Sequence, residues 1–126
     1  MDEHGEYQVE LIGRIISCVL KGSFNKDGCK SYTEAVREKV SQLRGEPFAM
    51  LVDDLELEGG TPEAYQELDA YNRWLSTQPI KAKALVINSP MQKDIMLKRA
   101  PALKTQNIEF FTDKSLAMAW LTQQLN

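Results

Sequence analysis

The chain has 126 residues, a length that suits one domain with one hydrophobic core. It is 43% hydrophobic and 26% charged, with 7 Gly and 5 Pro, and this composition excludes collagen-like, low-complexity and disordered proteins. The formal net charge of -3 argues against a protein that binds nucleic acid over its whole surface.

The charges are unevenly distributed along the chain. Residues 46–72 contain eight acids and no base, whereas residues 73–104 contain seven bases and one acid. The net charge therefore understates the local fields. If the two segments lie near one another in the fold, part of this charge is neutralised within the molecule.

The hydropathy of the sequence predicts neither a transmembrane segment nor a secretory signal. No stretch approaches the ~18–20 apolar residues that cross a bilayer, and the first residues lack the pattern of a secretory signal. We therefore expect a cytoplasmic protein without a transmembrane segment, in which residues 1–6 form a mobile N-terminus. The two cysteines form no disulfide or zinc pattern; Cys18 is expected in the core and Cys29 in a polar loop as an exposed thiol.

The first half of the chain predicts a hairpin and then a helix. Residues 7–20 read as two strands joined at Gly13. After a polar stretch, Ser31 and Glu34 have the spacing of a capping box, in which each side chain bonds the backbone amide of the other residue. This spacing and the apolar stripe that follows predict a helix over residues 32–44.

A buried strand and a second helix come next. Residues 48–52 are a continuous apolar run that ends in Asp53 and Asp54, which is typical of a strand covered on both faces. We expect the strand to end there and a turn to follow. Thr61 and Pro62 then predict the start of a helix, with the hydroxyl as cap and the proline in the first turn.

The rest of the chain continues this alternation. We predict a strand over 82–87, a helix over 91–99, a strand over 108–111 and a final helix capped by Asp113. The order is β-β-α-β-α-β-α-β-α within a single domain. It predicts an α/β fold with a mixed, mostly parallel sheet and right-handed crossovers.

The pattern resembles the STAS superfamily, and more closely its bacterial SpoIIAA-like (STAS/SEC14-type) families of small proteins. The resemblance rests on the opening hairpin, the 24–28 segment, Pro47 before Leu51-Val52-Asp53, Thr61-Pro62-Glu63-Ala64, Phe111-Thr112-Asp113 and Ala119-Trp120-Leu121. It implies a STAS-like fold that acts through contacts with other proteins. Resemblance to the lipid-binding SEC14 type implies an apolar ligand pocket.

In the antagonist branch of that superfamily, a partner kinase phosphorylates a serine in the turn that opens a helix. The turn of this chain over residues 55–61 has no Asp-Ser-Ser-Gly, and Thr61 is the hydroxyl at a comparable place. Thr61 is therefore the candidate phosphoacceptor, although the departure from the motif weakens the case for switching by phosphorylation.

No catalytic constellation is present, so we do not expect an enzyme. His4 is the one histidine and lies near the terminus, which leaves no triad within the domain. The dinucleotide motif G-x-G-x-x-G is absent, and no cofactor is expected. Asp53 and Asp54 are adjacent acids without further ligands, so no metal site is predicted.

The candidate contact residues lie at the expected strand end and on a basic helix. They are Asp53, Asp54, Leu55, Leu57, Thr61, Lys93, Lys98 and Arg99. Thr61, Ser89 and Asp113 are interpreted as helix caps, with an anion site at the free amides as the alternative. Solvated lysines around a core-facing helix are the alternative to a basic contact surface.

These features favour a small binding or regulatory interaction module. Its partner is expected to be another protein or a second copy in a homodimer, and not nucleic acid. The alternative is a carrier of a small apolar or lipid-like ligand in a SEC14-like pocket.

Overall fold

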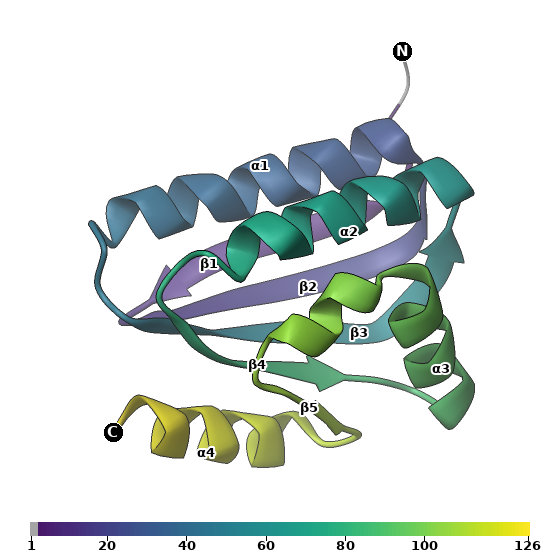
Figure 1. Cartoon of the computed structure of the whole chain (residues 1–126). Coiled ribbons are helices and arrows are strands. Elements are labelled where there is room, and N and C mark those ends of the chain that lie inside the picture. The colour runs from purple at the N-terminus through teal and green to yellow at the C-terminus, as the bar shows by residue number, and fades with distance from the viewer. Residues whose placement is uncertain (1–2) are drawn as a thin grey trace.

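A computed structural model describes residues 3–126 (Figure 1). The elements in chain order are β1 (Glu6–Ile12), β2 (Ile15–Phe24), α1 (Lys26–Gln42), β3 (Phe48–Gly60), α2 (Pro62–Leu75), β4 (Ile80–Val86), α3 (Pro90–Arg99), the 3-10 helix η1 (Pro101–Thr105), β5 (Ile108–Phe111) and α4 (Lys114–Leu125). The predicted order of strands and α-helices is confirmed. The sequence did not predict η1.

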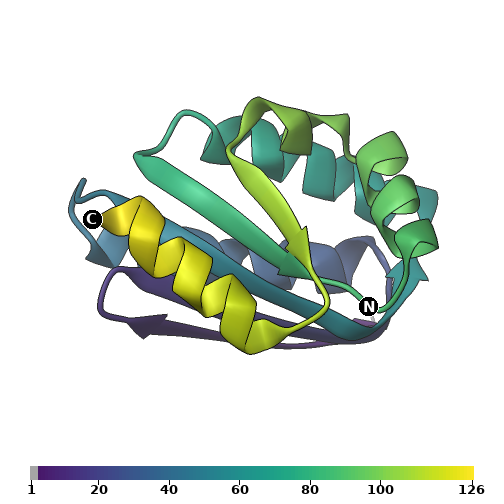
Figure 2. The same cartoon turned by 90° about the horizontal axis from the view of Figure 1, so that it is seen from below.

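The five strands form one sheet in the order β1-β2-β3-β4-β5. β1 pairs antiparallel with β2, and the three other pairs are parallel, so the mixed and mostly parallel sheet is confirmed. Helices α1 and α2 cover one face, with α3 and η1 beside α2, while α4 alone covers the other face (Figures 1 and 2).

The two faces of the sheet have cores of different size. On the face of α1 and α2 the core contains large side chains such as Met50, Tyr71 and Leu75. The face under α4 is lined by small residues such as Ala49 and Ala84, together with Ala117 and Leu121 of α4 itself. Residues 48–52 are all buried, which confirms that β3 is covered on both faces there.

Helix α1 begins at Lys26 and not at residue 32 as predicted. Asn25 is its cap, because the Gly28 amide donates to Asn25 Oδ1 at 2.9 Å. Ser31 lies inside the helix, where its hydroxyl donates to the Glu3 carboxylate, so the predicted capping box is wrong. Gly28 allows this early start, since a Cβ at that position would stand 2.0 Å from the carbonyl oxygen of His4.

The early start of α1 also places Cys29 in the core. The expectation of an exposed thiol is wrong, because the residue is on the buried side of the first helical turns. Burial, together with the nearby Glu67 carboxylate, raises the pKa of Cys29 to about 12. Cys18 is a core residue as predicted, and burial raises its pKa to about 12 as well. Neither thiol has the low pKa of a reactive cysteine.

Strand β3 continues well beyond Asp54, where the sequence predicted its end. It pairs with β4 only as far as Asp53, but it continues beside β2 to Gly60. The segment expected to be a turn is therefore strand. The alternation of leucines at 55 and 57 with acids at 56 and 58 is a strand pattern with one covered face, and it could have predicted this extension.

The N-terminal segment lies against the start of α1. Residues 1–6 were predicted to form a mobile N-terminus, and residues 1 and 2 of that segment lie outside the described residues. The His4 amide donates to Asn25 Oδ1 at 3.0 Å, and Glu6 already pairs with Lys21 in the sheet. Within residues 3–126, every helix is too short or too polar to traverse a bilayer.

Candidate functional site

The two adjacent acids of β3 point to opposite faces of the sheet. Asp53 lies on the side of α4, with its Oδ2 3.6 Å from Lys114 Nζ. Asp54 lies beneath α2 and is 2% exposed. Successive side chains of a strand alternate between faces, so these carboxylates do not meet at the sheet edge as the sequence analysis expected. They cannot jointly hold one cation.

Asp54 is a buried carboxyl group with an unsatisfied oxygen. Its Oδ1 is buried and has no hydrogen-bond partner among residues 3–126. Burial and, to a smaller extent, the neighbouring Asp53 charge raise the pKa of Asp54 to about 7, while Lys83 opposes the shift. Near neutral pH, therefore, a substantial fraction of this group carries a proton.

Lys83, on β4, is a second buried ionisable group in the same core. It is 2% exposed, and its Nζ donates to Asn72 Oδ1 at 2.7 Å. The same nitrogen lies 5.5 Å from the centre of the Tyr71 ring. Burial lowers the pKa of Lys83 to about 7. Lys83 is not among the site residues predicted from the sequence, although a charged residue inside a strand covered on both faces is a signal that could have identified it.

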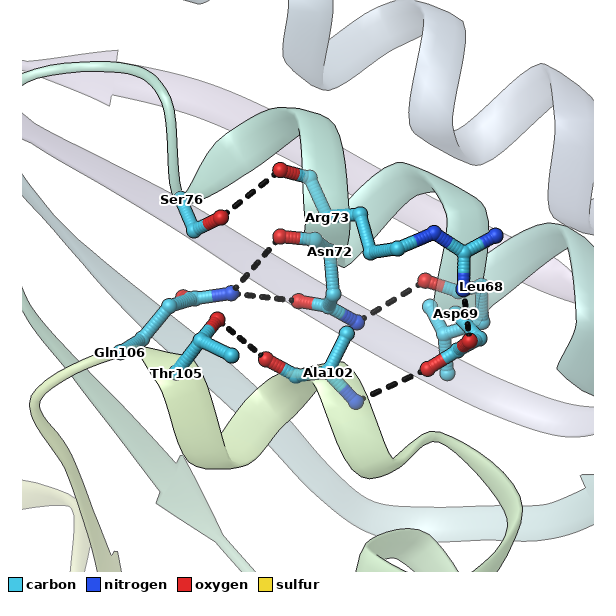
Figure 3. Close-up of polar contacts among 8 residues, drawn as sticks. All are labelled: Leu68, Asp69, Asn72, Arg73, Ser76, Ala102, Thr105 and Gln106. Atoms are coloured by element: carbon cyan, nitrogen blue, oxygen red, sulfur yellow. Dashed lines mark hydrogen bonds and ion pairs between the residues drawn. The ribbon is translucent and has the colours of Figure 1, made fainter.

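Asn72 is held so that its carbonyl faces Lys83. Gln106 Nε2 donates to Asn72 Oδ1 at 2.9 Å, and Asn72 Nδ2 donates to the Leu68 carbonyl at 3.0 Å (Figure 3). The Ala102 amide of η1 donates to Asp69 Oδ1 at 2.8 Å in the same region. Through these bonds η1 is attached to α2, and the amide of Asn72 is fixed in one orientation.

Asp54 and Lys83 line one partly open cavity of about 50 Å³, called the inner cavity below. Within the part of the chain that the structure describes, they form no ion pair with each other, since every Lys–Asp pair within 4.0 Å involves other residues. The remaining walls are mostly apolar and include Leu85 and Met96.

Two further hollows adjoin this inner cavity. The α2–α3 groove, lined by residues such as Asn88, Met91 and Ile95, has a volume of about 250 Å³. An apolar hollow of about 50 Å³ lies where α1 and α2 begin. Leu57 and Tyr65 line all three spaces. The groove and the inner cavity also share Met96, so these three side chains lie at the boundary between the two spaces.

The groove exists because β3 and β4 part after Asp53. The start of α3 supplies hydrogen bonds to the β3 edge that β4 leaves unpaired. Asn88 Nδ2 donates to the Leu55 carbonyl at 3.0 Å, and Gln92 Nε2 donates to the Asp54 carbonyl at 2.8 Å. These bonds satisfy two backbone carbonyls of the strand edge that borders the groove.

The predicted helix caps are confirmed at this edge. Thr61 Oγ1 accepts from the Ala64 amide at 3.1 Å, and Ser89 Oγ accepts from the Gln92 amide at 3.2 Å. On the other face, Asp113 Oδ1 accepts from the Ser115 amide at 2.8 Å. Each capping side chain thus binds a backbone amide at the start of its helix, and these amides are the donors that the alternative anion site would need.

The predicted basic helix, α3, has both a buried and an exposed apolar side. Met96 is buried, while Met91 is 70% exposed and Ile95 is 42% exposed. Lys98 and Arg99 are exposed at its end, and Lys93 Nζ lies 5.1 Å from the Phe110 ring centre. Among residues 3–126, no ion pair joins α2 to α3; the acidic segment 46–72 and the basic segment 73–104 are joined directly by the Arg73–Asp69 ion pair within α2.

The fold matches that of a known structure. The chain is similar to a crystal structure of an uncharacterised protein of the DUF3478 family from Shewanella loihica PV-4, with a TM-score of 0.72 over 96% of both chains. That protein has a SpoIIAA-like fold. The present chain has a SpoIIAA-like fold. This confirms the resemblance found in the sequence, and the sequence identity of 16% extends the conclusion to the fold alone.

The sequence comparisons add no activity to the SpoIIAA-like fold. No family model and no curated protein matches the chain. One fold supports many functions, so the function of this SpoIIAA-like chain has to be argued from its own side chains. The inner cavity and the α2–α3 groove are the part of the molecule with the chemistry to support that argument.

Proposed function

We propose that the protein is a binding module for a small, mostly apolar molecule that carries one polar group. The apolar part lies in the α2–α3 groove, and the polar group reaches the inner cavity between Asp54 and Lys83. The observation that carries the proposal is Asp54 Oδ1, a buried oxygen without a partner at the wall of a cavity. Native proteins rarely leave such an atom unpaired, because it costs roughly 1–3 kcal/mol.

The geometry of the site supports this type of ligand. Small-molecule sites are apolar clefts with a few convergent polar groups, and here the polar groups are a carboxyl and an amine on neighbouring strands. The carboxyl requires a donor and the amine requires an acceptor. A hydroxyl or a carbonyl with a nearby donor meets both needs.

Ligand entry requires Tyr65 or Leu57 to move. Tyr65 is only partly buried, and its hydroxyl lies beside Gly59, 3.8 Å from where a Cβ would stand. Gly59 has a φ of 125°, a conformation that favours glycine, and its lack of a side chain leaves space next to the Tyr65 ring. Rotation of this one ring would join the groove to the inner cavity.

The test uses 1-octanol, which has an eight-carbon tail and one hydroxyl. Titration calorimetry should detect saturable binding to the natural chain at one site. Ile95→Trp places a bulky ring in the groove and should weaken that binding at least tenfold. Leu116→Trp is the matched control, because Leu116 is also an exposed apolar residue but lies on α4, across the sheet. The absence of saturable binding, or equal binding by both variants, would contradict the proposal.

A second candidate function is association with a protein surface through α3. It is favoured by the exposed Met91 and Ile95, which have the basic Lys98 and Arg99 beside them on the same short helix. The partner would be a second copy that offers its own acidic segment, residues 46–72. Reversal of both charges, Lys98→Glu with Arg99→Glu, should lower the dimer fraction in sedimentation velocity; a natural chain that is monomeric at all concentrations would exclude this candidate.

Thr61 remains the proposed phosphoacceptor within this second candidate. It is exposed and caps α2, and a phosphate there would be favoured by the partial positive charge of the helix start. Intact mass of protein purified from its own cells tests this, since phosphorylation adds about 80 Da at one site. A Thr61→Ala variant should lose that mass.

A further inference from the structure

We propose that Lys83 captures its ligand covalently, by forming an imine with an apolar aldehyde or ketone in the inner cavity. This inference rests on the proposed function, because the carbonyl compound enters through the same groove. It goes beyond reversible binding, since it assigns the class of ligand and a bond to a specific atom.

The first support is the arrangement of groups around the Lys83 amine. Asn72 accepts one of its hydrogens at 2.7 Å and is itself fixed by Gln106, so the amine has a defined position. The same amine borders the inner cavity, on whose wall the unpartnered Asp54 carboxyl also lies. A nucleophile and an acid–base group therefore line one cavity, and no ion pair within 4.0 Å joins them to each other.

The second support is the protonation state that this environment imposes. Burial lowers the pKa of Lys83 to about 7, so about half of the amines are neutral and nucleophilic near pH 7. An exposed lysine of ordinary pKa has less than about 0.1% neutral amine at that pH. Asp54, whose pKa burial raises to about 7, can both give and take a proton in the same range.

The other ionisable groups that face Lys83 do not replace it as the nucleophile. Cys18 on β2, Tyr32 on α1 and Tyr71 on α2 all have a pKa raised by burial, and they remain protonated near neutral pH. The remaining polar neighbours, Asn72 and Gln106, are neutral amides. Lys83 is thus the nucleophile of this cavity.

The reaction needs no additional reagent. The lone pair of neutral Lys83 Nζ attacks the carbonyl carbon, and the carbonyl oxygen takes a proton from protonated Asp54. The nitrogen returns a proton to the Asp54 carboxylate, which gives a neutral carbinolamine. Asp54 then protonates the hydroxyl, the C–O bond breaks and water leaves as the nitrogen lone pair forms C=N. Loss of the last N–H proton to Asp54 yields the imine; the sum is amine plus carbonyl to imine plus water.

The test is reductive trapping of the full chain with octanal at pH 7. Cyanoborohydride converts an imine to a secondary amine, and peptide mapping identifies the modified lysine. We expect Lys83 to be labelled at least tenfold faster than Lys81, an exposed lysine on the same strand. In urea the advantage of Lys83 should disappear, since it depends on the folded cavity. Labelling of Lys83 no faster than Lys81 in the folded chain would overturn the inference.

Variants separate the roles of the two ionisable groups. Lys83→Met should abolish the fast labelling, whereas Lys81→Met should leave it in place. Asp54→Asn should slow the labelling of Lys83 at least tenfold, because no group then transfers the protons. An unchanged labelling rate in Asp54→Asn would contradict the assigned proton transfer.

The alcohol separates this inference from the proposed function. Octanol has the same tail as octanal but cannot form an imine. If octanol binds at the groove and octanal leaves Lys83 unmodified, covalent capture is wrong and the proposed function stands. If neither molecule binds, both proposals fail.

Discussion

Replacing Asp54 by Asn should stabilise the protein in a pH-dependent manner. Asn has nearly the shape of Asp but stays neutral at all pH values. Burial raises the pKa of Asp54 from 3.8 to about 7, so the folded protein binds this proton more tightly than the unfolded chain. The stability that comes from the bound proton is complete below pH 3.8 and is lost as the pH rises through 7.

The size of the effect follows from the shift of roughly 3 pKa units. At about 1.4 kcal/mol per unit, the ionised Asp54 costs the natural protein about 4 kcal/mol above pH 7. Asp54→Asn should therefore match the natural protein near pH 4 and exceed its free energy of unfolding by up to about 4 kcal/mol at pH 8. The ionisable groups that interact electrostatically with Asp54 are Lys83, Cys18, Tyr32 and Tyr65, together with Asp53 on the opposite face of the sheet.

The assay is urea unfolding followed by tryptophan fluorescence at pH 4, 6 and 8. Trp74 is a suitable probe, because its ring stacks on that of Tyr71 at 6.3 Å between centres, close to the buried pair. Glu58→Gln is the control, since Glu58 is an exposed acid on the same strand and its change should stay within about 0.5 kcal/mol. A constant difference between Asp54→Asn and the natural protein from pH 4 to pH 8 would refute the reasoning.

Three further changes give distinct outcomes in the same unfolding assay. Lys83→Met should stabilise the protein by about 5 kcal/mol at pH 6, because the folded pKa of about 7 lies about 3.5 units below the ordinary 10.5, and this gain should vanish toward pH 10.5; equal gains at pH 6 and 10 would contradict it. Asn72→Ala should lower the free energy of unfolding by about 2–3 kcal/mol, since it leaves Lys83 and Gln106 without their shared acceptor. A decrease of less than about 0.5 kcal/mol would show that this network is not formed. Asn25→Ala should cost about 1 kcal/mol, whereas Ser31→Ala should cost less than about 0.5; the reverse order would favour the capping-box start of the helix.

The sequence predicted most of the sheet because its strands carry direct local signals. Short apolar runs predict β3 and β4, and a glycine predicts the turn between β1 and β2. The starts of α2, α3 and α4 are predicted in the same way, because each capping residue lies within a few residues of the amides it binds. The start of α1 was missed because two cap patterns compete there. Ser31 has the better local motif, but the packing of the N-terminal segment against Gly28 favours Asn25.

The inner part of the site could not be predicted in the same way. Asp54 was selected as a strand-end acid, but its burial depends on β3 continuing beside β2 after β4 has diverged. Lys83 and Asn72 are eleven residues apart and meet only when α2 packs on β4. Gln106 comes from the region after η1, which had no clear helix signal. Long-range packing, and not local pattern, assembles these groups.

The central claim is that a small apolar molecule binds between α2 and α3 and reaches the inner cavity. Methyl-labelled methionine tests it most directly, because Met91 lines the groove and Met96 lines both spaces, while Met118 lies on α4 across the sheet. During titration with 1-octanol, the NMR signals of Met91 and Met96 should shift and saturate together, and that of Met118 should stay in place. Unmoved Met91 and Met96 signals, or a Met118 shift of equal size, would contradict the account.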